Sequence, residues 1–523
     1  MSRSERGAQA PADAGGDALG SEAFVEVPRP NMSAVAGALR WKGLTFVVGQ
    51  GSWYAALLVL AILLPPSAFG IIAIGTAVTT ATALLINAGA AGAIIATPQV
   101  GAAYIRRALL RTTLVGLALT GLALLLAGPI VNAFAKGANP DVLRVMMLTI
   151  AFAAVTIVPN ALLQKLMRFK LLAVTVIAGA VIASAAAITA ALLGAGVWAL
   201  VIRLVVNQLV ITILVWVYAL PLFPRGAGRE RANPPRGRAT WFLVIATAYF
   251  CTLTLDNMIV GHLTDVTQLG LYALAFSLGF APLRQISWHV GAVLFPSIAA
   301  TKDPASVERR TMKSLQLMAL LLLPMLPPAI ALAPGLIPTV LGEEWTGMVI
   351  PFQVLLGVGI GQGLINILAE TLSVTRVDVR GRIEVVWAAG VLTGVAVGTG
   401  LVGIEGAALG HLIAFSGLAS AYLWFGTRAI GTSPRRVLQA IRGVVGCVVA
   451  QAIATGLLVV GIGAAGGGVL LAGILAAAGG LIVLTPLLWV SQRDVIAELR
   501  KFLAAVDPRR RAVPAVPASA AGD

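Results

Sequence analysis

The chain has 523 residues, of which 59% are hydrophobic and only 11% charged, and its formal net charge is +16. Its mean hydropathy is +0.94, and apolar runs of about 20 residues recur along it, the length at which a helix spans a bilayer. These values exclude an ordinary soluble domain. The absence of cleanly alternating ten-residue segments also excludes an outer-membrane barrel.

The two ends of the chain differ from the rest in composition. Residues 1–40 are rich in Ala, Gly, Ser and acidic residues and contain no apolar stretch that would mark a cleavable signal. The sequence "DPRRRAVPAVPASAAGD" closes the chain with a similar bias. We therefore expect disordered cytoplasmic tails at 1–40 and 493–523.

Proline, glycine and charged residues divide the remainder into apolar segments. We predict an all-α integral membrane protein with about fourteen transmembrane helices, and an even number of helices places both termini on one side. The predicted spans are 42–64, 69–97, 105–134, 141–163, 169–193, 196–220, 241–263, 268–296, 308–341, 347–375, 381–401, 404–427, 437–462 and 466–491.

The basic residues test this division. With the N-terminus inside, 33 of the 37 Lys and Arg residues fall on the inner side, and only Lys136 and Arg144 fall outside. Cytoplasmic loops carry such an excess in multi-spanning proteins. If one helix were missed, every later loop would be assigned to the wrong side of the membrane and the excess would be lost. The pattern predicts the cytoplasmic (inner) membrane with both termini cytoplasmic, and it accounts for the net charge without a nucleic-acid partner.

An internal repeat relates the two halves. Residues 59–78 align without a gap on 259–278, with Leu63/Leu263, Gly70/Gly270 and Ala73/Ala273 identical, and the loop pattern recurs at a similar offset. Parallel repeats with a substrate path between them are typical of transporters. We predict an N-lobe at 41–220 (helices 1–6), a basic cytoplasmic linker at 221–240, a C-lobe at 241–430 (helices 7–12), and an added pair, helices 13 and 14, at 431–492.

Three stretches carry a resemblance to a known family. They are "ALRWKGLTFVVGQGSWYAALLVLAILLPPSAFGIIAI" (38–74), "LDNMIVGHLTDVTQLGLYALAFSLGFAPLRQISWHVGAVLFPSIA" (255–299) and "LAPGLIPTVLGEEW" (332–345). The first resembles the opening of the Wzx-like polysaccharide and oligosaccharide flippases, in which Leu-Leu-x-Pro ends helix 1 and Phe-Gly begins helix 2. The second resembles the start of that family's second half, and the third its helix 9 exit.

The resemblance covers about residues 35–430 and implies the polysaccharide branch of the multidrug/oligosaccharidyl-lipid/polysaccharide exporter superfamily. It departs from the family pattern at "LTDVTQ", which is less basic than usual. It implies a flippase that moves a polyprenyl-diphosphate-linked oligosaccharide from the inner to the outer leaflet by alternating access, for export of surface polysaccharide or cell-envelope glycan. It also implies a glycan polymerase and glycosyltransferases of the same pathway as partners.

Asp256 and Asn257 form the most unusual polar pair within a predicted span. Intramembrane carboxylates usually face the bundle interior or a wet cavity, because exposure to lipid is costly. Asp256 and Asn257 are both candidates for substrate binding. We expect Asp256 to face a central cavity and Asn257 a neighbouring helix, so that Asp256→Asn would impair transport at near-normal membrane levels. The alternative is a structural hydrogen bond between the two side chains.

Two arginines also fall within predicted spans. Arg203 lies in helix 6, and Arg284, followed by Gln285, lies in helix 8. A guanidinium holds phosphate oxygens in a bidentate fork, so these residues are candidates for substrate binding. Each arginine has the alternative of snorkelling or an internal salt bridge.

Trp53 adds an aromatic face that would suit sugar rings, with plain packing as its alternative. Other polar or special residues have structural interpretations. Prolines crowd helix 9 and must kink it, and glycine at every fourth position of 390–398 suits close helix packing. Glu370 and Glu384 are expected to pair with the basic 376–382 loop rather than to contact substrate.

The sequence contains no nucleophile–base pair, metal-ligand cluster or phosphate-binding loop, so it predicts no enzyme, catalytic residue, metal or cofactor. Two alternatives to the flippase stay open. One is a multidrug/cation antiporter of the same superfamily, a branch that usually has twelve helices. The other is a membrane glycan polymerase or ligase, which would need larger outer loops than the sequence provides.

Overall fold

The computed structural model describes residues 41, 43–87, 91, 94–95, 99–223, 238–287 and 303–491, together with the strand at 24–26. Among these residues, 13 helices are long and apolar enough to cross a membrane, and a shorter apolar helix spans Val47–Leu63. The all-α membrane fold predicted from the sequence, with about fourteen transmembrane helices, is confirmed.

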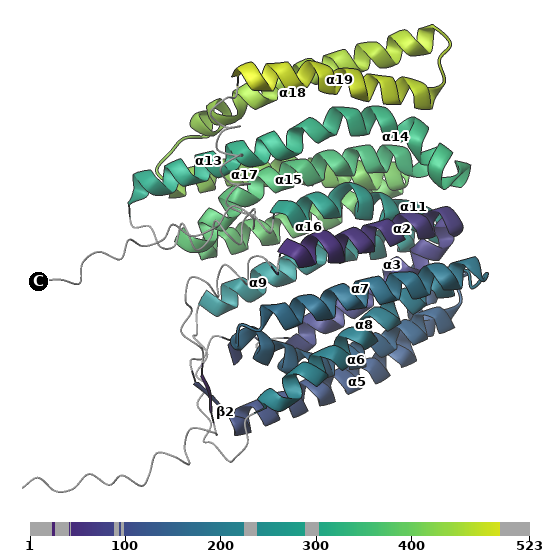
Figure 1. Cartoon of the computed structure of the whole chain (residues 1–523), viewed down its shortest axis with the longest axis vertical. Helices are drawn as coiled ribbons and strands as arrows, with labels where there is room; N and C mark the ends of the chain where they lie inside the picture. Colours follow the sequence, from purple (N-terminus) through teal and green to yellow (C-terminus); the bar gives the residue numbers. More distant parts are fainter. Residues whose placement is uncertain are drawn as a thin grey trace, which may run out of the picture.

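Most of the N-lobe lies in the lower part of Figure 1, drawn from purple to teal-blue, while α2 crosses the middle of the view. Its elements are η2 (Thr45–Gln50), α2 (Gly51–Leu63), α3 (Pro66–Asn87), α5 (Ala102–Phe134), α6 (Pro140–Lys165), α7 (Phe169–Leu192), α8 (Trp198–Ala219) and the short turn η3 (Leu220–Leu222).

Most of the C-lobe and the added pair lie in the upper part of Figure 1, while α9 lies near the middle of the view. Their elements are α9 (Arg238–Phe250), η4 (Cys251–Leu255), α10 (Asp256–Leu263), α11 (Val266–Ala275), η5 (Phe276–Phe280), α13 (Pro304–Leu322), η6 (Leu323–Met325), α14 (Leu326–Leu341), η7 (Glu343–Met348), α15 (Val349–Thr375), α16 (Val377–Val402), α17 (Ile404–Ala429), α18 (Pro434–Ala464) and α19 (Val469–Ser491).

The packing of the helices repeats between the lobes. In the N-lobe α7 packs on α8, α6 on α8 and α2 on α7. In the C-lobe α16 packs on α17, α15 on α17 and α10 on α16. The corresponding helices therefore have the same neighbours in the same chain direction, as the parallel repeat predicts. The added helices α18 and α19 pack on each other and on α14, at the far side of the C-lobe.

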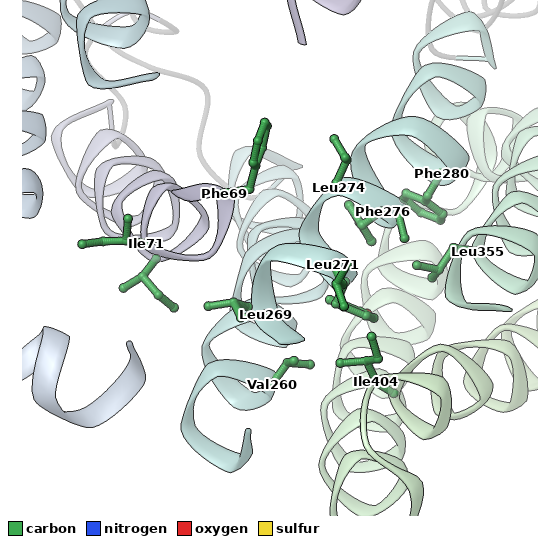
Figure 2. Close-up of a cluster of buried hydrophobic side chains, with 14 of the residues drawn as sticks. Phe69, Ile71, Val260, Leu269, Leu271, Leu274, Phe276, Phe280, Leu355 and Ile404 are labelled. Carbon is green, nitrogen blue, oxygen red and sulfur yellow. The ribbon is translucent and has the colours of Figure 1, made fainter. Parts of the chain in front are cut away.

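The two lobes meet at one end of the bundle, which we call the short-loop end because it contains the short connections 64–65, 135–139 and 264–265. One continuous apolar core joins residues of both lobes there, including Ile74 and Met146 from the N-lobe and Leu269 and Tyr272 from the C-lobe. Figure 2 shows side chains of α3, α11, α15 and α17 in this cluster. The edge of Trp345 also packs on Phe69 across the lobes, with ring centroids 5.3 Å apart.

Two repeat-related glycines allow this approach. A Cβ on Gly70 would overlap the carbonyl oxygen of Val266, and a Cβ on Gly270 would overlap the carbonyl oxygen of Pro66. Pro66 and Val266 are themselves 200 residues apart, so the contact is reciprocal between α3 and α11. Backbone contact between α3 and α11 as close as this requires residues without a side chain. Nearby, His262 Nδ1 lies 3.0 Å from the carbonyl oxygen of Ala133.

Other local features follow the sequence closely. The prolines of helix 9 divide it into α13 and α14, separated by the 3₁₀ turn η6, because proline removes a backbone donor and clashes with the preceding turn. Gly394 and Gly398 of α16 approach the backbones of Gly410 and Gly406 in α17. Large apolar side chains such as Leu125 and Ile413 point outward, as expected for a surface that faces lipid.

The predicted tails lie mostly outside the described residues, as do residues 224–237 of the predicted linker. Within the segment 1–40, Phe24–Glu26 forms strand β1, which pairs antiparallel with β2 (Gln99–Gly101). This short strand lies within the segment for which the sequence predicts a tail without structure, and its partner is the segment before α5.

Candidate functional site

A cavity of about 300 Å³ lies at the junction of the lobes. The N-lobe contributes α2, α3 and α8 to its wall, and the C-lobe contributes η4, α10, α11 and η5. Four of the residues predicted from the sequence line it, namely Trp53, Arg203, Asn257 and Gln285. The structure therefore brings together residues that are up to 232 positions apart in the sequence.

Arg203 is the charged group in the wall of this cavity. It is only 2% exposed, its guanidinium stacks on the Trp53 ring at 3.7 Å from the centroid, and it donates to the Trp53 carbonyl oxygen. Its Nε has no hydrogen-bond partner among the described residues, and no described carboxylate pairs with it. A buried guanidinium that keeps free donor capacity beside a cavity can hold an anion. Trp53 therefore supports Arg203 as well as lining the wall.

Arg284 is not among the residues that line the cavity. Its guanidinium lies 6.0 Å from the centroid of the Tyr249 ring. Gln285, its neighbour in the chain, does line the cavity, so Arg284 adds positive charge next to the cavity.

The prediction that Asp256 faces the cavity and Asn257 faces a neighbouring helix is wrong. Asn257 lines the cavity, whereas Asp256 is completely buried. Asp256 Oδ1 accepts from the backbone N–H of Asn257 at 2.8 Å and from its Nδ2 at 3.2 Å, and Oδ2 accepts from the Tyr272 hydroxyl at 3.2 Å. The carboxylate is turned toward these donors because burial without them would be costly. Asp256 therefore positions Asn257 and does not contact the cavity.

This arrangement reverses the expectation for Asp256→Asn. The amide keeps an oxygen to accept from Asn257, and the Tyr272 hydroxyl can accept from the new NH₂ group. We expect normal membrane levels and near-normal transport. Asp256→Ala instead leaves buried donors without partners, at about 1–3 kcal/mol each, and should lower the melting temperature of the purified protein. Impaired transport in Asp256→Asn at normal thermal stability would show that the charge itself is needed.

A second polar cluster lies inside the C-lobe. Arg380, which is 5% exposed, pairs with Glu370 at 3.3 Å and with Glu384 at 3.8 Å. It also donates to the Ser373 hydroxyl, and the Tyr422 hydroxyl donates to Glu384 at 2.5 Å. The predicted pairing of the two glutamates with the 376–382 region is confirmed, and it links α15, α16 and α17.

Removing Arg380 should therefore destabilise the C-lobe strongly. Arg380→Met leaves two carboxylates without a cation in a buried site, and breaking a buried pair costs about 3–5 kcal/mol. We expect a large fall in melting temperature in detergent and low membrane levels. Arg144→Met is the matched control, because Arg144 and Asp141 form an exposed pair of the kind that contributes at most about 1 kcal/mol. Equal effects of the two substitutions would contradict this assignment.

The sequence did not single out a group of threonines that lines a neighbouring cavity in the N-lobe. Thr76, Thr79 and Thr80 of α3 and Thr149 of α6 face this space. Threonine is common in membrane helices, so the only signal in the sequence was the clustering "TAVTTAT" at 76–82.

Comparisons with known proteins agree with this architecture. The profile of a family described as "Polysaccharide biosynthesis protein" matches residues 59–350, more than half of the chain. An inward-facing multidrug resistance MATE family transporter of the MOP superfamily is similar at 14% identity, with 75% of this chain and 98% of that chain covered and a TM-score of 0.54. The lipid II flippase MurJ in an inward closed conformation is similar at 14% identity, with 89% and 98% covered and a TM-score of 0.52.

No curated protein matches the sequence. At this level of identity the two solved structures show that the fold is shared with transporters of this kind. The family profile is more specific, because it spans the end of helix 1, helices 2–6, the linker and the first three helices of the C-lobe. The chain is a multi-pass membrane protein that belongs to the polysaccharide biosynthesis protein family.

Proposed function

We propose that this protein moves a polyprenyl-diphosphate-linked oligosaccharide from the inner to the outer leaflet of the cytoplasmic membrane by alternating access of its two lobes. The substrate would be a precursor of surface polysaccharide or cell-envelope glycan. The family description and the fold shared with a lipid II flippase support a role in such a pathway.

The observation that carries the proposal is the charge of the cavity between the lobes. Arg203 lies in its wall without a carboxylate partner among the described residues, and Arg284 is the chain neighbour of Gln285, which also lines the wall. No Asp or Glu is among the residues that line this cavity or the adjoining one. An uncompensated cation in a low-dielectric site favours an anion and disfavours a cationic ligand. A diphosphate matches this charge, whereas a cationic drug does not.

The way in which the lobes meet supports alternating access. They are held together at the short-loop end by contacts between α3 and α11 and between α10 and α5. In a rocking movement these contacts would separate as the opposite ends of the lobes approach. The cavity at the junction would then open toward the other leaflet, with the diphosphate retained beside Arg203.

Binding by the purified protein distinguishes this function from cation transport. We expect undecaprenyl diphosphate to bind more tightly than undecaprenyl phosphate by about tenfold, because a second phosphate offers further charge-assisted hydrogen bonds of about 1.5–3 kcal/mol. Tetraphenylphosphonium should not bind in the cavity. Tight tetraphenylphosphonium binding that Arg203→Gln strengthens would instead support the antiporter.

In the cytoplasmic membrane the short-loop end would face the outside, because the excess of Lys and Arg is at the opposite end of the helices. Reporter fusions after Gly137, Ala195 and Gly466, all in connections at the short-loop end, should report the outside. A fusion after Gly431, in the turn between α17 and α18, should report the cytoplasm. A cytoplasmic result at any of the first three sites would contradict this orientation.

A further inference from the structure

The N-lobe contains a second cavity, of about 280 Å³, between α3, α6 and α8. Thr76 and Leu204 line both this cavity and the central one, so the two spaces adjoin. We call this second space the threonine cavity, after Thr76, Thr79, Thr80 and Thr149 in its wall. Asn207 and Gln208 add two amides, and none of the lining residues is charged.

The threonine hydroxyls are arranged as acceptors. Thr76 donates to the Ala73 carbonyl at 2.8 Å, Thr80 to the Thr76 carbonyl at 2.7 Å, and Thr149 to the Met146 carbonyl at 2.6 Å. Each of these hydroxyls thus donates its one hydrogen bond to a carbonyl of its own helix and can still accept a hydrogen bond from another group. The threonines do not hydrogen-bond across helices in this region, so helix association does not account for their clustering.

Asn207 supplies the complementary donors. It is partly buried, and its carboxamide makes no hydrogen bond to any described residue. A primary amide offers two N–H donors and an oxygen acceptor. Acceptors on α3 and α6 line the same cavity as the Asn207 amide of α8, whose oxygen lies close to Gly179 of α7. Such a wall suits a ligand with many O–H groups, because each hydroxyl is both donor and acceptor.

The spacing on α8 connects this cavity to Arg203. Asn207 follows Arg203 by four residues, so both lie on the same face of α8 about 6 Å apart. In a lipid-linked oligosaccharide the first sugar is bonded directly to the diphosphate. A diphosphate held by Arg203 would therefore place that sugar beside Asn207.

We propose that the threonine cavity binds an uncharged sugar of the substrate, the one next to the diphosphate; this inference rests on the proposed function. The diphosphate itself does not fit there, because the wall offers no cation. The polyprenyl chain does not fit either, because burying the hydroxyls and the amide against hydrocarbon would leave them without partners.

The test compares two probes that differ only in the sugar, undecaprenyl diphosphate and undecaprenyl diphosphate carrying one N-acetylglucosamine. Asn207→Leu should weaken binding of the glycosylated probe by about tenfold, the loss of one or two hydrogen bonds of about 1 kcal/mol each. Binding of undecaprenyl diphosphate should be unchanged. Thr149→Val keeps the shape and removes one acceptor, and should weaken only the glycosylated probe, by about threefold.

Asn160→Leu is the matched control, because Asn160 lies on α6 outside both cavities and accepts from Gln164. It should alter neither affinity. An equal effect of Asn207→Leu and Thr149→Val on both probes, or no effect on either, would overturn the sugar site and leave the proposed function standing. If Asn207→Leu fails to fold, Thr149→Val decides alone. Failure of the wild-type protein to bind undecaprenyl diphosphate would instead overturn the proposed function.

Discussion

Arg203→Gln is expected to abolish most transport of a polyprenyl-diphosphate oligosaccharide while the protein still reaches the membrane. The guanidinium lies in the cavity wall, stacked on Trp53, and has no carboxylate partner among the described residues. Charge-assisted hydrogen bonds to a phosphate contribute about 1.5–3 kcal/mol, which corresponds to about 10- to 100-fold in affinity. Initial transport rates in proteoliposomes below saturating substrate should fall by the same factor.

Arg203→Lys separates charge from geometry. Lysine keeps the positive charge but lacks the bidentate fork and the flat surface that stacks on Trp53. We expect intermediate activity, because the cavity remains cationic. Melting temperatures of the three proteins should differ little if Arg203 serves the substrate. A collapse of thermal stability in Arg203→Gln, with transport restored by a stabilising lipid, would assign Arg203 to the structure of the N-lobe.

Gly270→Ala is expected to prevent the lobes from closing at the short-loop end. A single methyl group there would overlap the carbonyl oxygen of Pro66, and neither backbone can move without separating α11 from α3. Each lobe keeps its own packing, so the protein should fold. The state with this end closed should become rare, and transport should fall by about tenfold or more, since a shift of about 1.4 kcal/mol is enough.

Cysteine cross-linking reports this closure directly. Cysteines at positions 133 and 262, whose residues are in contact in the closed end, should cross-link efficiently in the parent protein with Cys251 and Cys447 replaced by serine. They should cross-link poorly when Gly270→Ala is added. Gly121→Ala on α5 is the control, because a Cβ there meets no atom within 4 Å. Undiminished cross-linking in Gly270→Ala would contradict the closing contact.

Much of this fold could be predicted from the sequence because the membrane restricts the possibilities. A span must satisfy its backbone hydrogen bonds internally, so apolar length alone identified helices such as α7 and α17. The repeat relation Gly70/Gly270 also had a structural meaning, since these two residues form the reciprocal contact between lobes. Strand β1 was missed because a three-residue strand depends on a distant partner, Gln99–Gly101, which no local pattern reveals.

The site could be predicted only in part. A charge within a span signals an interior position, and Arg203 lines the cavity together with Trp53. The side chains of consecutive residues point about 100° apart around a helix, so the sequence alone does not decide which of Asp256 and Asn257 faces the cavity, and the prediction for Asp256 is wrong. Asp256 instead accepts a hydrogen bond from Tyr272, 16 residues away. The threonine cavity depends on α3, α6 and α8 converging, and no short motif in the sequence encodes this.

We propose that a diphosphate lipid crosses the membrane through the cavity that contains Arg203. The most direct measurement is protein-dependent flipping of undecaprenyl diphosphate carrying one N-acetylglucosamine in proteoliposomes, read by an enzyme that acts only on sugar exposed outside. We predict flipping with the wild-type protein and near-background rates when Arg203→Gln is combined with Arg284→Gln, at equal amounts of folded protein. Background rates with the wild type, or wild-type rates with the double variant, would contradict the account.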